Sequence, residues 1–560
     1  MEKDRVAILV ENVTDMTDVT DRCITPQEVT FPLESGSATI KGKAISTLKN
    51  ITAASEADIV GGDHAQPKVM KTEILIGSGQ VRKALTEAEL ALAQSGRYFQ
   101  RDGRIAEVLQ LPGDGSWCIK DLDELGVLHA LAGLTQWMRP DNKGSLKYVD
   151  PHPLVCKMLS RVGQFEYLQV LNGLAFQPHL RPDATICNVP GYDEKTGLFG
   201  VFNVDDVIVP DAPTMEDART ALACLQGLIE ECAVATPVDR STAISAMLTA
   251  AVRPGLPTAP MFHVKAHQMG TGKSFLCQLI TAFSSDKSGA PVSFPRSEGD
   301  CKNLLLSQFK RSPPVIDFDN LTSDIPAYAS LCTALTSEWL EGRLLGGNTI
   351  ARVSTRTLML SSGNNVGPSA DMARRTLTIL LDSATEVPAA RKFKRPNLMA
   401  EVLRDRNRYI SAALTIVKAW VVAGRPMTEC PPLGSFGQWS DWCRQPLLWL
   451  GCPDPVESVF KALEDDPERQ LLGRVLEGWQ IRLGSGPVLA REVTQAAISK
   501  LAVDDDLHDS LIEVSGGQGS VNQRKLGRWL SRNEGRVVNG KRLLRAPKSR
   551  NVESWQVVSV

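Results

Sequence analysis

The residues best suited to chemistry in this sequence form a short glycine-rich segment between two apolar runs. Residues Pro260 to Ala266 are typical of a β-strand and Phe275 to Phe283 of a helix, with HQMGTGKS between them. Gly270 and Gly272 permit the backbone dihedral angles that turn successive N–H groups toward a phosphate. A helix that starts directly after such a loop adds its positive end at the same place. The segment therefore predicts a phosphate-binding loop.

The last residues of this segment supply a charge and a metal ligand. Lys273 places a point charge near the β- and γ-phosphates of a nucleotide, and the Ser274 hydroxyl can ligate Mg²⁺. The usual GxxxxGKS/T pattern is met except at its first glycine, where His267 stands. A loop without this chemistry is the alternative, but the flanking strand and helix favour a nucleotide site. We therefore expect ATP and Mg²⁺ as cofactors, with the nucleotide bound by Gly270, Thr271, Gly272, Lys273, Ser274 and Phe275.

A further apolar run, Val315 to Asn320 (VIDFDN), contains two acidic side chains. Side chains alternate along a strand, so Asp317 and Asp319 should lie on one face. One can hold Mg²⁺ while the other orients the attacking water, and we favour Asp319 for the metal. Asn320 follows, and an amide can position water but cannot accept a proton. The identity of the base that activates the attacking water is therefore left open. An acid-capped turn without a catalytic role is the alternative for the whole run.

Two later segments carry polar groups suited to phosphoryl transfer. The strand expected at Thr357 to Ser362 is followed by Asn364 and Asn365, whose amides are placed to contact the γ-phosphate or the attacking water. Arg374 and Arg375 come next, and guanidinium groups suit the negative charge that builds up during the transfer. One of these arginines is the candidate that acts on ATP bound by a neighbouring subunit. A helix-dipole partner or a surface charge is the alternative.

The elements that must hold these residues alternate between strand and helix. From Pro260 to Ala390 the order strand, loop, helix repeats, which predicts an α/β fold with a parallel sheet covered by helices. Two helices are expected before it, Thr214 to Val234 with a capping threonine and early acids, and Ser241 to Val252. Pro396 to Gly424 is expected to be helical as well.

The composition is that of a soluble folded chain, since 43% of the residues are hydrophobic and 22% are charged. The 12 cysteines form no CxxC pair and have no paired histidines, so neither a zinc site nor an oxidising compartment is expected. The apolar stretch Ile410 to Gly424 is too short to span a bilayer and contains Lys418. We therefore expect a cytoplasmic protein that does not contact a membrane.

A formal net charge of −2 gives no global sign of nucleic-acid binding, but one segment is strongly basic. Between Arg524 and Arg550 the single acid, Glu534, stands against ten Lys or Arg, a concentration that suits the neutralisation of phosphates. Alternation with apolar residues suggests a winged helix that lies on duplex DNA, with Trp529 in its core. A solvated basic face without a DNA partner is the alternative. The candidate DNA contacts are Lys525, Arg528, Arg532, Arg536, Lys541 and Arg542.

In their order and spacing, GTGKS, VIDFDN, SSGNN and DMARR resemble the motifs of AAA+ helicases related to superfamily 3. Particularly similar are the replication helicases, and the helicase parts of primase-helicases, of phages, phage satellites and integrated mobile elements. The segments LRPD, PGYD and TGL between residues 180 and 198 resemble the part that precedes the motor in that family, and residues 526–555 resemble its C-terminal module. The departures are His267, Asn320 where many members have glutamate, and an N-terminus without a primase-like acid cluster, so priming is not implied.

The resemblance and the composition together imply an order of domains around an AAA+ P-loop core. The first residues are rich in Thr, Ser, Asp and Gly and lack periodicity, which is typical of a flexible leader. We expect the leader over 1–70, an N-terminal α+β accessory domain over 71–210, the AAA+ core with its preceding helices over 211–395, a helical lid and linker over 396–510, and a winged-helix-like module over 511–560.

The resemblance also gives a role to the segment Glu341 to Arg352, which has a hairpin pattern with a Gly-Gly-Asn tip. In the related helicases a hairpin at this place enters the pore of the ring and grips the strand. Arg343 and Arg352 are the basic residues nearest that hairpin, so they become candidate contacts to single-stranded DNA. An ordinary surface hairpin is the alternative.

These observations predict an ATP-dependent DNA helicase, a hexameric ring that moves along single-stranded DNA to replicate a mobile genetic element. Its partners would be single-stranded and duplex DNA, further copies of the chain, and a separate primase or other replication proteins. A replication initiator or DNA-binding regulator that assembles on nucleotide without unwinding is one alternative, which Asn320 keeps open. An ATP-driven factor that acts on protein is another.

Overall fold

The computed structural model describes residues 29–33, 36–40, 71–113, 115–203, 207–287, 289–344, 350–464, 466–498, 506–515, 520–549 and 552–560. The chain divides into two compact units, Met1–Met70 and Lys71–Val560. In the first unit, strand β1 (Val29–Leu33) pairs antiparallel with strand β2 (Gly36–Ile40). The rest of the leader that was predicted over 1–70 lies outside the described residues.

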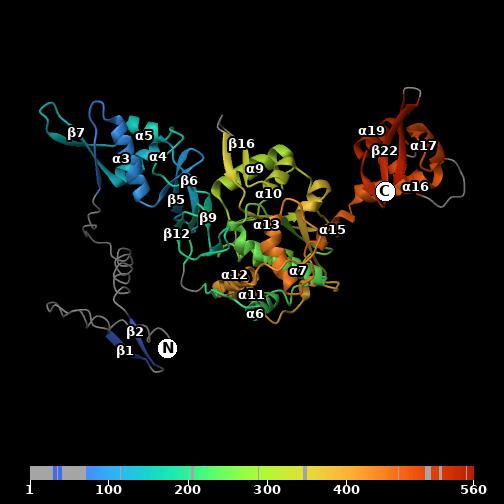
Figure 1. Ribbon diagram of the computed structural model, residues 1–560, viewed down its shortest axis with the longest axis horizontal. Coiled ribbons are helices and arrows are strands. Elements are labelled where there is room, and N and C mark those ends of the chain that lie inside the picture. The colour runs from blue at the N-terminus through green and yellow to red at the C-terminus, as the bar shows by residue number, and fades with distance from the viewer. Residues whose placement is uncertain are drawn as a thin grey trace. The chain divides into compact units, whose positions relative to one another are not determined.

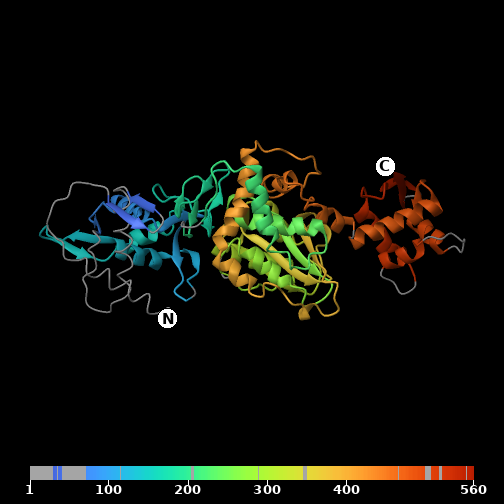
Figure 2. The same ribbon diagram turned by 90° about the horizontal axis from the view of Figure 1, so that it is seen from below.

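The second unit contains a four-stranded parallel sheet with the strand order β15-β18-β14-β19. Its strands are β14 (Met261–Ala266), β15 (Val315–Leu321), β18 (Leu358–Asn364) and β19 (Thr376–Leu381). Nearly every side chain of β14 and β18 is buried, as expected of parallel strands covered on both faces. Figure 2 shows this sheet with helices around it. The predicted α/β fold with a parallel sheet is confirmed.

Helix α6 (Met215–Gln226) comes before the sheet and starts where the sequence predicts. Thr214 accepts a hydrogen bond from the backbone N–H of Asp217, and the Asp217 side chain accepts one from Thr214, so two free N–H groups are satisfied reciprocally. The helix ends well before the predicted Val234. Gly227 caps it, and the following residues turn back toward the sheet.

Two other helices start earlier than the sequence predicts. Helix α7 (Pro237–Val252) was expected from Ser241, but its side-chain cap is Thr236. Helix α8 (Lys273–Thr281) was expected over 275–283, and it starts directly after the glycine-rich loop. The causes differ: α7 begins where Thr236 caps a free N–H group, and α8 begins where the left-handed Gly272 ends the loop, in both cases ahead of the first residue of the apolar pattern.

The remaining elements of this region complete a single large hydrophobic core. Its buried residues include members of the sheet and of α6, α7, α8 and α12, and the cluster runs across the predicted domain boundary at 395/396. These elements are η2 (Arg253–Gly255), α9 (Glu298–Arg311), α10 (Ala329–Thr336), β16 (Trp339–Arg343), β17 (Ile350–Ser354), η3 (Ala370–Arg375), η4 (Pro388–Ala390), α11 (Leu398–Arg404), α12 (Arg406–Val422), α13 (Gly437–Trp439), η5 (Ser440–Arg444), α14 (Gln445–Trp449) and α15 (Glu457–Glu464).

The part of the unit that precedes α6 mixes short helices and strands around two smaller hydrophobic clusters. Helices α3, α4 and α5 pack together, and Figure 1 shows them beside β7. The elements are β3 (Thr72–Leu75), α3 (Val81–Gln94), β4 (Tyr98–Arg101), β5 (Arg104–Gln110), β6 (Trp117–Asp121), α4 (Glu124–Leu134), β7 (Thr135–Pro140), β8 (Leu146–Val149), α5 (Pro153–Leu159), β9 (Gly173–Ala175), β10 (His179–Leu180), β11 (Ile186–Cys187), β12 (Gly191–Asp193) and β13 (Leu198–Gly200).

The last residues form a further hydrophobic cluster of four helices and an antiparallel sheet. Its buried residues run from Leu472 to Val557, so α16 and α17 share a core with α19, across the predicted boundary at 510/511. Among the described residues, no helix combines the length and the apolar composition that crossing a bilayer requires. The elements are α16 (Pro467–Leu483), β20 (Val488–Leu489), α17 (Ala490–Ile498), α18 (Leu507–Ser515), α19 (Gln523–Asn533), β21 (Val537–Val538), β22 (Lys541–Ser549) and β23 (Val552–Ser559).

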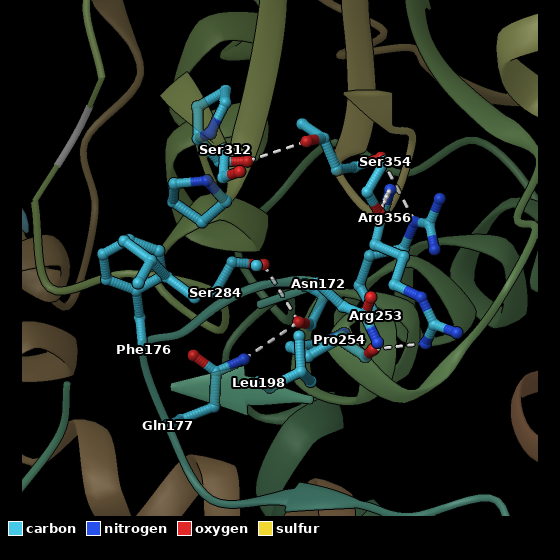
Figure 3. A pocket seen from close by; sticks show the side chains of 16 residues that line it. Asn172, Phe176, Gln177, Leu198, Arg253, Pro254, Ser284, Ser312, Ser354 and Arg356 are labelled. Carbon is cyan, nitrogen blue, oxygen red and sulfur yellow. Dashed lines mark hydrogen bonds between the residues drawn. The ribbon is translucent and has the colours of Figure 1, made fainter. Parts of the chain in front are cut away.

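A polar junction joins the segment around β9 and β10 to the helices beside the sheet. The Gln177 side chain donates to the carbonyl groups of Ala250 and Ala251, each at 3.2 Å. The fully buried Arg253 guanidinium donates to the carbonyl oxygens of Thr355 and Thr357, in the loop between β17 and β18. Figure 3 shows Gln177 and Arg253 at a cavity of about 20 Å³. Since these donors satisfy otherwise buried carbonyl groups, the cavity is part of the packing.

Candidate active site

The glycine-rich loop lies between the end of β14 and the start of α8. Gly270 and Gly272 have φ values of +75° and +95°, which side chains other than glycine rarely adopt. Gly272 is the N-cap of α8, so the first N–H groups of that helix follow the loop without side-chain caps. Ala266, the last residue of β14, is paired with Asn364 of β18. The loop therefore starts directly beside the end of the neighbouring strand.

Lys273 contacts the end of β18. Its ammonium group donates a hydrogen bond to Oδ1 of Asn364 at 2.7 Å, and the residue is only 9% exposed. Burial lowers the pKa of Lys273 below its ordinary value, while the nearby carboxylate of Asp319 acts in the opposite sense. A largely buried cation whose hydrogen-bond partner is a neutral amide is well prepared to bind an anion.

Ser274 contacts the end of β15. Its hydroxyl donates to Oδ1 of Asp319 at 3.0 Å, and the hydroxyl of Ser362 donates to the same oxygen. Ser362 in turn accepts the backbone N–H of Asn320 at 3.2 Å. A hydroxyl and a carboxylate oxygen at this distance are the hard ligands that Mg²⁺ prefers. The residues therefore fit a magnesium site between the loop and β15.

The second acid of this strand, Asp317, has a different environment. Burial, and then the charge of Asp319, raises the pKa of Asp317 from its ordinary value to about 6. One of its carboxyl oxygens is buried without a hydrogen-bond partner among the described residues. Asn320 has a φ of +57°, a left-handed conformation that asparagine tolerates. The strand thus ends in one paired carboxylate, one unpaired carboxyl group and one amide.

Asn365 is directed to the loop backbone instead of to Lys273. Its side-chain oxygen lies 3.0 Å from Nδ1 of His267, and its amide nitrogen donates to the carbonyl oxygen of His267 at 3.3 Å. The residue that replaces the first glycine of the usual pattern is therefore bound to the segment that follows β18. Of the two predicted asparagines, Asn364 is the one that faces the charged residues of the site.

The two predicted arginines share one partner but differ in exposure. Arg374 and Arg375 both pair with the carboxylate of Asp371. The Arg375 side chain is 10% exposed and also donates to the backbone carbonyl of Asp371 at 2.8 Å. The Arg374 side chain is 46% exposed. Arg374 is therefore the arginine that a neighbouring molecule can reach.

The predicted hairpin is present as β16 and β17, which pair antiparallel, while the tip at 345–349 lies outside the described residues. The Arg352 guanidinium lies 4.7 Å from the ring of Trp339 and 3.5 Å from the carboxylate of Glu341. Arg343 is exposed and has no ion pair with a described residue. The two predicted DNA contacts thus differ: one is held by the hairpin and the other is available.

The predicted basic module places its charges unevenly. On α19, Arg524, Lys525, Arg528 and Arg532 are exposed and form no ion pair with a described acid. The apolar side of the same helix buries Leu526 and Leu530, and Trp529 is half-buried against that core. The other predicted contacts, Arg536, Lys541 and Arg542, are less free, since Arg536 binds Asn533 and the latter two are partly buried.

One residue of the site escaped the sequence analysis. Ser362 was expected as a strand residue without a role, yet it supports Asp319. The available signal was its position two residues before Asn364 on β18, which puts both side chains on one face of that strand.

The chain was also compared with known proteins. No protein-family model and no curated protein matches it. Among solved structures it is similar to the apo structure of the NrS-1 C-terminal region, with 12% identity over 85% of this chain and 99% of that chain and a TM-score of 0.33. It is also similar to SCCmec type IV Cch, described as an active helicase (10%, 83% and 97%, TM-score 0.29), and to JCV helicase (11%, 47% and 72%, TM-score 0.19). At these TM-scores the likeness carries no functional argument, so function must come from the site itself.

Proposed function

We propose that this chain is an ATP-dependent DNA helicase. The observation that carries the proposal is a pair of contacts at the carboxyl edge of the parallel sheet. Lys273 binds Asn364 at 2.7 Å, and Ser274 binds Asp319 at 3.0 Å. Together they bring the loop cation, a magnesium ligand pair and a phosphate-sensing amide to one place. Ligands of open α/β sheets bind at this edge.

Nucleotide binding follows from the loop and the start of α8. The N–H groups after Gly270 and Gly272 would surround the phosphates, with Thr271 in the loop and Phe275 in the first turn of α8. Lys273 would exchange its bond to Asn364 for one to the β- and γ-phosphates. Mg²⁺, held by the Ser274 hydroxyl and the Asp319 carboxylate, would neutralise phosphate charge.

Hydrolysis needs a base and a group that stabilises the developing charge. Asp317 is our candidate base, because it has an unpaired oxygen and a pKa of about 6. Asn320 and Asn364 would orient the attacking water and the γ-phosphate. Arg374, from the next copy of the chain, would contact the transferred phosphoryl group, while Arg375 holds Asp371 in place.

Arginine supplied in trans requires an oligomer, and we propose a hexameric ring. Within it, the β16–β17 hairpin with Arg343 and Arg352 would grip single-stranded DNA, and α19 would bind the duplex through its unpaired cations. We further propose that the protein works in the cytoplasm, together with a separate primase, in the replication of a mobile genetic element. In this proposal the segment before α6 is the accessory domain and the residues from α16 onward are the winged-helix-like module.

ATP hydrolysis by the full chain, with and without single-stranded DNA, tests the proposal. Turnover that rises with DNA and disappears in Lys273→Ala is the expected result. Arg491→Ala, an exposed cation of α17 outside the site, is the matched control and should leave turnover unchanged. Wild-type protein that binds ATP but never hydrolyses it would refute the motor.

That last outcome would favour the second candidate, an initiator or regulator that assembles on nucleotide. The observation behind this candidate is Asn320, an amide directly after the Asp319 carboxylate. An amide cannot accept the proton of the attacking water. In that case ATP would change the oligomeric state without being consumed, which light scattering can measure.

A further inference from the structure

A second group of metal-ligating side chains lies in the strands before α6, apart from the nucleotide loop. His179 and Cys187 are direct cross-strand partners in the β10–β11 hairpin, and Asp193 ends β12. The ligand atoms of these three residues all lie within 4.8 Å of one another. His179 is 1% exposed and Cys187 is 3% exposed. The hairpin register thus brings an imidazole and a thiol to one buried point beside a carboxylate.

The imidazole of His179 is unusual because it is buried without the hydrogen bonds that a buried polar group normally makes. Both of its ring nitrogens are buried, and neither makes a well-formed hydrogen bond to a described residue. A buried polar group without a partner destabilises the folded state, so its presence calls for an explanation. A cation bound by one ring nitrogen would supply the missing partner.

The carboxylate of Asp193 is already held in position. Arg181 donates to its Oδ1 atom from two nitrogens, at 3.0 and 2.7 Å, and Oδ2 accepts from Thr196 at 2.7 Å and from Nε of Arg181, which is shared with Oδ1, at 3.1 Å. Ligating carboxylates are normally fixed by hydrogen bonds of this kind, which orient the remaining lone pairs. The same bonds keep the positive charge of Arg181 beside the cation, so a thiolate and a carboxylate would leave one net positive charge at the site.

We propose that His179, Cys187 and Asp193 bind one zinc ion, with a water molecule as the fourth ligand. A thiolate and an imidazole select zinc over magnesium or calcium, which prefer oxygen ligands. Zinc binding releases the thiol proton of Cys187, and the ion's two positive charges are balanced by the thiolate and the carboxylate. No CxxC pair is needed, because the ligands come from three strands of two hairpins.

The position of the cluster suggests what the ion does. β10 lies directly against η2, the turn that leads into β14, and a Cβ atom on Gly255 of η2 would be 2.1 Å from the carbonyl oxygen of Leu180. An ion that joins β10, β11 and β12 would therefore hold this segment against the turn before the nucleotide loop. The role we propose for zinc is structural, and it does not depend on the proposed helicase activity.

Zinc content and cobalt spectroscopy of the full chain test this inference. After dialysis against a weak chelator, the wild-type protein should retain one zinc ion per chain. Replacement by Co²⁺ should give a thiolate-to-metal charge-transfer band together with visible bands of a four-coordinate ion. Cys187→Ser should abolish the charge-transfer band and His179→Ala should release the metal. Cys224→Ser, a half-buried cysteine of α6, should change neither.

Two results would overturn the inference. One is wild-type protein that takes up no zinc, or a cobalt complex without a thiolate band, and this result needs no variant. The other is a folded Cys187→Ser protein that keeps the full zinc content. Because magnesium binding at Ser274 and Asp319 involves no sulfur, the thiolate band distinguishes the two sites.

Discussion

Lys273 donates a hydrogen bond to Oδ1 of Asn364 at 2.7 Å, across 91 residues of sequence. The contact joins the first residue of α8 to the last residue of β18. The ammonium group of Lys273 and the side-chain amide of Asn364 therefore lie side by side. Without nucleotide, each group satisfies the other. A γ-phosphate that binds there must replace the Asn364 amide as the hydrogen-bond partner of Lys273. Phosphate binding is therefore linked to the position of β18.

Asn364→Ala should lower kcat of ATP hydrolysis by about 10²-fold with little change in KM, because a polar contact to the reacting phosphate is lost. Asn365→Ala is the matched control, since that side chain binds His267 and not Lys273. Steady-state ATPase kinetics separate the two variants. Equal losses in both would show that Asn364 has no special place in the site.

Ser362→Ala should weaken Mg²⁺ dependence, because the Asp319 carboxylate loses one of its two serine donors. We expect the Mg²⁺ concentration for half-maximal turnover to rise by about tenfold, as for other partners of metal ligands. The measurement is a Mg²⁺ titration of ATPase activity at fixed ATP. Ser307→Ala, an exposed serine of α9, serves as control. An unchanged titration would mean that Ser362 only packs β18.

Arg374 and Arg375 should separate into a catalytic and a structural residue. Arg374→Ala should fold normally and lose about 10³-fold in turnover, whereas Arg375→Ala should lower the free energy of unfolding by about 1–3 kcal/mol. Mixing Arg374→Ala with Lys273→Ala subunits should restore part of the activity, since one interface can then be complete. Thermal unfolding and ATPase assays decide the matter. Absence of any rescue on mixing would argue against action in trans.

The partly buried Asp317 should make stability fall as pH rises from about 4 to about 6. Its pKa is raised to about 6 from an ordinary value of 3.8, so the folded protein binds the proton more tightly than the unfolded chain does in that window. The stability is present below pH 4 and lost above pH 6, by up to about 3 kcal/mol. Asp317→Asn should remove this slope in denaturant unfolding of the nucleotide-free protein. A slope that persists in the variant would assign the titration to another group.

The double variant Arg524→Ala, Arg528→Ala should weaken binding to duplex DNA and reduce the salt dependence of the affinity by about two phosphate contacts. The cause is the loss of two exposed, unpaired cations of α19. Fluorescence anisotropy at several salt concentrations measures both effects. Arg491→Ala on α17 should keep the wild-type salt slope. Unchanged affinity of the double variant would show that the basic face of α19 is solvated and does not bind duplex DNA.

The order of the elements could be predicted because local patterns carry it. The glycine-rich loop, the apolar runs around it and the two strands of the β16–β17 hairpin were all expected near their observed positions. Helix boundaries were less predictable. The starts of α7 and α8 depend on Thr236 and Gly272, which lie outside the apolar pattern.

The set of elements and the chemical types at their ends could thus be predicted, because backbone propensity and side-chain periodicity are local. Which of several similar residues meet could be learned from the folded structure alone. In the folded structure Asn364, and not Asn365, is the partner of Lys273. The Arg374 side chain is exposed, whereas the Arg375 side chain is buried. The fold also brings His179 and Cys187 together across a hairpin. The physical reason is that strand register and packing, which join residues far apart in the chain, set distances and exposure.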